Sequence, residues 1–279
     1  MTLLPWVAIF AAAGAAWTHT MRPAVFPLLL VGYGLAIAEG RIAGDAWGAI
    51  ALLAAAGYAV TRPSRPVHIA GHVLFVLLAA ALALHLVAGF DNALVIDAQR
   101  ITPDALPFSM YLNLDKPLIG FWLLLAWGGL RLSTSARACA RGAAIGGTLA
   151  ALLCLSAAVA MGMIDWAPKW PHNAWLWLIN NALLVVFVEE ALFRGYVQGS
   201  LERWLAGRPL GPAIAILIAA LLFGLAHAGG GWQWVVLATL AGLGYGVSYR
   251  AGGLQAAMLA HLGVNLLHYG AFTYPMRAL

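Results

Sequence analysis

The sequence predicts an all-α protein that crosses a membrane as a bundle of about eight to ten helices. Of its 279 residues, 63% are hydrophobic and only 9% are charged, whereas a soluble domain carries roughly 25% charged residues. So few charged side chains cannot cover the surface of a soluble globule of this size. The net charge is only +5 and the arginines are scattered, so binding of nucleic acid through a basic face is not expected.

Ten apolar stretches, each bounded by charged residues, Pro or Gly, are the predicted helices. The first two are short enough to be tilted or re-entrant. The first also lacks the basic start of a cleavable signal peptide, so it is expected to remain as a span. The segment 91–117 is the one sizeable loop and the candidate for structure outside the bilayer. The approximate bounds are 3–17, 24–38, 45–61, 67–90, 117–132, 142–164, 174–199, 209–228, 232–249 and 254–272.

The positive residues alternate between the connections and so predict an orientation. Connections of one parity hold nine Lys or Arg residues and a single acid, Glu202. Those of the other parity hold five positive and seven acidic residues. Because positive loops stay in the cytoplasm, both termini are expected outside it. The predicted location is the inner membrane of a bacterium, as a multi-pass protein.

The stretch VVFVEEALFRGYVQ, residues 185–198, places three ionisable side chains inside a predicted span. Such residues are costly in a membrane and usually have a partner or a function. Glu190 and Arg194 are four residues apart, so they share a helix face and can form an ion pair. Glu189 is rotated by about 100° from Glu190 and has no cation nearby in the sequence. We expect Glu190 and Arg194 to be supporting residues and Glu189 to face a wet cavity as a base; the alternative is a purely structural trio.

Three further polar residues in the later spans are site candidates. His227 ends one apolar helix, and His261 and Asn265 are four residues apart on the next but one. Glu189 and His227 each lie nineteen residues from Arg208, in the turn between their helices. They are therefore expected at similar depth and facing each other, as a Glu–His pair that holds one water would need. A histidine in a span can equally be a helix–helix hydrogen bond.

Together these residues resemble the CPBP family, the CAAX proteases and bacteriocin-processing enzymes, also called Abi proteins. That family's motifs are Glu-Glu-x-x-x-Arg, Phe-x-x-x-His and His-x-x-x-Asn on successive membrane helices. Here they are Glu189 to Arg194, Phe223 to His227, and His261 to Asn265, in order. The resemblance covers about residues 174–272. It therefore predicts a catalytic helical core at 171–279, preceded by membrane helices of unmatched sequence at 1–170.

The resemblance implies a glutamic-type intramembrane endopeptidase that needs no cofactor. In that family Glu189 would activate a water and His227 would help to hold it. His261 and Asn265 would donate hydrogen bonds to the oxyanion, while Glu190 and Arg194 would support the site. Hydrolysis without a Ser or Cys nucleophile does require an activated water and an oxyanion stabiliser. The implied partners are the lipid bilayer and a membrane-associated protein or peptide, such as a C-terminal sorting tag or a peptide precursor.

Two alternatives remain open on the sequence. Glu189, His227 and His261 could instead be the three ligands of a catalytic zinc, although the H-E-x-x-H helix pattern is absent. The protein could also be a non-enzymatic bacteriocin immunity factor or membrane scaffold, since the family includes members linked to self-immunity. A transporter would show repeated halves, and the sequence shows no such duplication.

Overall fold

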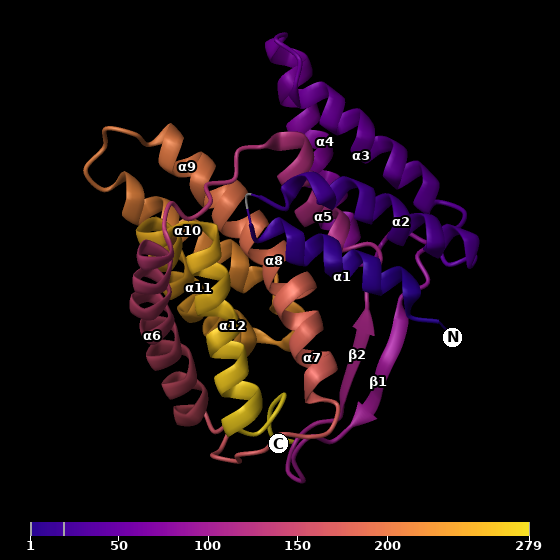
Figure 1. The fold of residues 1–279 in the computed structure, drawn as a ribbon. Helices are drawn as coiled ribbons and strands as arrows, with labels where there is room; N and C mark the ends of the chain where they lie inside the picture. Colours follow the sequence, from indigo (N-terminus) through magenta and orange to yellow (C-terminus); the bar gives the residue numbers. More distant parts are fainter. Residues whose placement is uncertain (1, 19, 279) are drawn as a thin grey trace. The chain divides into compact units, whose positions relative to one another are not determined.

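A computed structural model describes residues 2–18 and 20–278 of the chain. The described residues form mostly helices, which confirms the predicted all-α class (Figure 1). The chain divides into two compact units. The first contains the described residues up to 95 together with 111–129 and 183–188, and the second contains 96–110, 130–182 and 189 onward.

The first unit is built from paired helices: α1 packs on α2, and α3 packs on α4. Proline within the first two positions of α1, α4 and α5 suits a helix start, where a missing N–H costs nothing. Trp122 ties α5 to this unit, since its indole Nε1 donates to the carbonyl of Leu53 over 2.9 Å and its ring stacks on Phe75. The helices are α1 (Leu4–Ala16), α2 (Val25–Ala38), α3 (Ala46–Val60), α4 (Arg65–Ala83) and α5 (Pro117–Trp122).

The second unit is a bundle in which α6 lies along α11 and α12, and α10 packs on α11. Small residues permit the closest of these approaches. A Cβ atom on Gly244 of α11 would lie 2.5 Å from the carbonyl oxygen of Gly146 on α6, so the two backbones are in direct contact. Such contacts are typical of helix packing in membranes. The helices are α6 (Ala136–Ala160), α7 (Ala174–Asn180), α9 (Gly199–Trp204), α10 (Gly211–Leu225), α11 (Trp232–Gly252) and α12 (Leu254–Ala271).

Each of the ten predicted stretches contains a helix in the described residues, but two end earlier than predicted. The helix expected at 67–90 ends at Ala83, just before His85, whose φ of +55° is incompatible with a continuing α-helix. The one expected at 117–132 ends at Trp127 after a π-helical turn, because Gly128 adopts a left-handed φ of +68°. The segment 91–117 contains two paired strands, β1 (Ala93–Gln99) and β2 (Phe108–Leu112).

Three helical segments of the described chain are long and apolar enough to cross a membrane: Arg65–Ala83, Ala136–Ala160 and Ala174–Trp204. Several other apolar helices contain only 10–17 residues. A helix of 15 residues is roughly 22 Å long, shorter than the hydrocarbon core of about 30 Å. The long apolar helices support a location in a membrane, while the number of spans and their orientation stay predictions.

Candidate active site

The helix that carries the two glutamates is continuous over Ala174–Trp204 but is not regular. Two π-helical stretches, Asn181–Val185 and Ala191–Gln198, flank the short α-helical turn α8 (Val186–Glu190). π-Helical turns are rare and often occur at functional sites. The side chain of Glu189 is 29% exposed, whereas that of Glu190 is fully buried. The two neighbouring carboxylates therefore lie in different surroundings.

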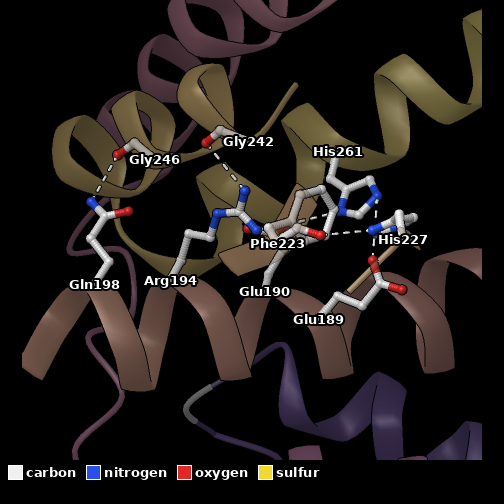
Figure 2. Close-up of polar contacts among 9 residues, drawn as sticks. All are labelled: Glu189, Glu190, Arg194, Gln198, Phe223, His227, Gly242, Gly246 and His261. Carbon is white, nitrogen blue, oxygen red and sulfur yellow. Dashed lines mark hydrogen bonds and ion pairs between the residues drawn. The ribbon is translucent and has the colours of Figure 1, made fainter. Parts of the chain in front are cut away.

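Glu190 and Arg194 form a buried ion pair, with Arg194 Nη1 3.2 Å from Glu190 Oε1 (Figure 2). The guanidinium also donates from Nη2 to the carbonyl of Gly242 on α11 over 3.1 Å, and it lies over the ring of Phe223. A Cβ atom at position 242 would lie 3.1 Å from Nη2 and equally close to Ala220, so glycine permits this close approach. One turn further along, Gln198 donates to the carbonyl of Gly246 in the same way.

His261 on α12 is the residue that contacts both glutamates. Its Nδ1 lies 2.8 Å from Glu190 Oε1, and its Nε2 lies 3.9 Å from Glu189 Oε2 (Figure 2). The ring of Tyr245 stacks on the imidazole, with centroids 4.4 Å apart and an angle of 14° between the planes. The position of His261 is therefore fixed from three sides.

His227 lies immediately beyond α10 and hydrogen bonds within its own motif. Its Nδ1 is 2.8 Å from the carbonyl oxygen of Phe223. Because a carbonyl can only accept, Nδ1 must carry the hydrogen, and Nε2 is then the unprotonated nitrogen of the neutral ring. Glu189 was expected to face His227, but within the described residues Glu189 forms its ion pair with His261. The depth argument concerned Glu189 and His227 alone and gave no reason to expect His261 beside Glu189.

Asn265, one turn beyond His261, is oriented by Asn181, which the motifs did not predict as a site residue. Its Nδ2 donates to the side-chain oxygen of Asn181 over 2.8 Å. An amide nitrogen has two hydrogens, so one remains for another acceptor. Asn181 and the neighbouring Asn180 are polar residues in an otherwise apolar helix start, and that irregularity was the available signal. Nothing in the sequence marked Tyr245 as a site residue, since aromatic residues are common in membrane helices.

The polar residues meet at a cavity of about 90 Å³ within the second unit. One water needs about 10–15 Å³ of such space, so several waters fit. Cys154, Tyr245 and many apolar side chains line the remaining wall, which includes Met163, Trp234, Leu237 and Met276. Glu189 does not line this cavity, but it contacts His261, which does. The polar residues of the wall are His227, His261, Asn265 and His268.

The residues proposed as zinc ligands do not converge on one point. Across the part of the chain that the structure describes, no three His, Cys, Asp or Glu side chains lie close enough together to hold a metal ion. The Nδ1 partners of His227 and His261 are a carbonyl and a carboxylate, which metal-binding histidines also use. The spacing of these side chains thus disfavours a zinc site. The hydrogen bonds to Nδ1 of His227 and His261, by contrast, are of the kind that zinc-binding histidines make.

Residues 171–267 match the model of the Rce1-like type II CAAX prenyl endopeptidase family. The three motifs, from Glu189 to Asn265, all lie inside that range. Comparison with curated proteins and with solved structures gave no significant match. The match agrees with the resemblance drawn from the motifs and supports a membrane endopeptidase of the CAAX type. Residues 171–267 are therefore similar to the Rce1-like CAAX protease family.

Proposed function

We propose that the protein hydrolyses a peptide bond in a membrane-associated protein or peptide, using a water activated by Glu189. The observation that carries this proposal is the 3.9 Å between Glu189 Oε2 and His261 Nε2, beside the cavity that His261 and Asn265 line. A water that donates one hydrogen bond of about 2.8 Å to each of two acceptors spans roughly 4–4.5 Å between them. The observed 3.9 Å is slightly shorter than this span, so a small movement of the Glu189 side chain, which is 29% exposed, would admit a single water between the two atoms.

Glu189 is the base because it alone of the two glutamates is open to water. Glu190 is neutralised by Arg194 and has no access to solvent. As the water oxygen bonds to the carbonyl carbon, Glu189 takes a proton from the water and the carbonyl becomes an oxyanion. The C–N bond then breaks, and Glu189 returns the proton to the leaving amine. General base catalysis of this kind contributes roughly 10²- to 10⁴-fold to a rate.

His261 acts beside Glu189 as a second partner of the water. A charged Glu190 accepts from Nδ1–H of His261, so Nε2 of the neutral ring is an acceptor rather than a donor. This ring could donate to an oxyanion only after gaining a proton, and Glu190 would then stabilise its positive charge. We assign His227 a supporting part: its unprotonated Nε2 accepts a hydrogen bond from this water in place of His261, since a water has only two hydrogens to donate.

Asn265 provides the neutral hydrogen-bond donor for the oxyanion. Its bond to Asn181 orients the amide and leaves one N–H for the developing charge. Donors fixed before the reaction are effective because they need no reorganisation as the charge forms. The apolar wall of the cavity supports a substrate whose residues near the cleaved bond are apolar.

Glu189→Gln tests this proposal, with Glu39→Gln as the matched control. Both changes remove one carboxylate, but Glu39 bonds to Arg41 and Thr2 at the end of α2, outside the site. Each protein would be reconstituted with membrane-anchored peptides, and new chain ends would be identified by mass spectrometry. Cleavage is expected with wild type and Glu39→Gln only. Equal cleavage by a folded Glu189→Gln protein would refute the role of Glu189, and no cleavage by wild type across a broad peptide library would favour a scaffold or immunity protein.

A further inference from the structure

Four arginines surround a second cavity of the second unit, at the end of the bundle where α9 and α11 finish. This cavity has a volume of about 530 Å³, within the usual range for small-ligand sites. One glutamate, Glu202, also lines it, so four positive charges and one negative leave a net +3. The arginines are Arg131, Arg203, Arg208 and Arg250.

Most contacts of these arginines are with neutral groups: Arg203 donates to the Ser200 hydroxyl over 3.0 Å, and Arg131 donates to the carbonyl of Tyr249. Glu202 lies 3.9 Å from Arg250, a weak contact, and also accepts from Gln198 over 3.0 Å. Arg131 lies over the ring of Tyr249, which holds it at the cavity wall. Arg208, in the loop between α9 and α10 (Figure 1), makes no side-chain hydrogen bond or ion pair with any described residue. The cavity therefore has more positive charge than its own acid can balance.

Exposed apolar side chains flank the same loop. Trp204 at the end of α9 is 77% exposed, and Leu210 before α10 is 69% exposed. Trp is enriched at the level of lipid headgroups because its ring is amphipathic. An apolar rim beside a basic cavity fits a ligand with an anionic head and hydrocarbon chains better than a free anion.

We propose that this cavity binds the phosphate headgroup of an anionic phospholipid, with the acyl chains lying along Trp204 and Leu210. Arginine forks bond phosphate oxygens in pairs, and basic pockets at the cytoplasmic side of membrane helices bind such headgroups. The connections that hold these arginines are those predicted to be cytoplasmic. This inference does not depend on the proposed proteolytic function.

The test compares two double variants that remove the same charge. Arg203→Gln with Arg208→Gln changes the cavity, whereas Arg137→Gln with Arg141→Gln changes two exposed arginines of α6 outside it. The full chain in a neutral detergent is titrated with phosphatidylglycerol or phosphatidylcholine, and bound lipid is counted by native mass spectrometry. The cavity variant should bind phosphatidylglycerol about 25-fold more weakly, roughly fivefold for each charge. The α6 variant should change less than threefold.

Equal loss of binding in both double variants would overturn the proposal, because it would indicate a general charge effect. Equal binding of phosphatidylcholine and phosphatidylglycerol would also overturn it. So would displacement of the lipid by an equal concentration of inorganic phosphate, which would indicate a site for free anions. If the double cavity variant does not fold, Arg208→Gln alone should still weaken binding about fivefold, since the Arg208 side chain makes no hydrogen bond or ion pair with any described residue.

Discussion

Arg194→Gln should destabilise the protein by roughly 3–5 kcal/mol, because it leaves the carboxylate of Glu190 buried without its counter-charge. Both side chains are fully buried and their charged atoms are 3.2 Å apart. The change also removes the hydrogen bond to the Gly242 carbonyl and the contact with the ring of Phe223. Glu190→Gln should be costly for the converse reason, since it leaves a buried guanidinium unpaired.

The double variant Glu190→Gln with Arg194→Gln should be more stable than the less stable single variant. It removes both charges, so neither is left in an apolar environment, and two amides can still bond each other. Unfolding in one detergent measures the effect. Since each kcal/mol lowers Tm by about 2–4 °C in a chain of 150–250 residues, the loss for Arg194→Gln should be about 6–20 °C. Arg137→Gln, an exposed change on α6, is the control and should stay within about 0.5 kcal/mol of wild type.

A double variant no more stable than the worse single variant would refute this reasoning, because it would mean that the two charges do not compensate each other. Activity gives an independent readout of the same network. At equal folded fraction, Glu190→Gln should lose more cleavage rate than Arg194→Gln, because Glu190 also bonds Nδ1 of His261. The opposite order would contradict the role of Glu190 in orienting that histidine.

Two further predictions concern other polar residues. Asn265→Ala should lower kcat about 100- to 1000-fold with little change in KM, as loss of an oxyanion donor does. Asn181→Ala should lower kcat less, because it only releases the Asn265 amide. Equal effects of Asn265→Ala on KM and kcat would contradict the role of Asn265 as an oxyanion donor. Burial lowers the pKa of Lys169 from its usual 10.5 to about 8, and its Nζ has no hydrogen-bond partner among the described residues. The folded protein thus holds this proton less tightly than the unfolded chain, so stability should rise between pH 8 and 10.5. Thermal unfolding across that range should show the rise in wild type but not in Lys169→Met. The same dependence of Tm on pH in both proteins would contradict the lowered pKa of Lys169.

Most of the helices could be predicted because they coincide with long runs of apolar residues. Each of the ten long apolar stretches bounded by charge, Pro or Gly contains a helix in the described residues, including the one that carries Glu189. Helix ends were less predictable, since they depend on single backbone conformations. The positive φ of His85 and Gly128 ends two helices early, and nothing in the local hydropathy indicates either.

The motifs predicted residues that the structure brings close together, but not which of them are in contact. The i, i+4 spacing gave the Glu190–Arg194 pair correctly as neighbours on one face. Which histidine lies beside Glu189 depends on how α10, α11 and α12 pack, and spacing along the chain does not contain that information. Tyr245 and Asn181 were missed for the same reason, because their importance comes from His261 and Asn265 on another helix.

The most direct test of the central claim, that Glu189 activates water without a metal, is the zinc content of active protein. The claim predicts far less than one zinc per chain by elemental analysis, and cleavage that survives prolonged chelation. His261→Ala should then leave the metal content unchanged while it lowers the rate. One zinc per chain in wild type, lost together with activity in His261→Ala, would contradict the claim and favour Glu189, His227 and His261 as metal ligands.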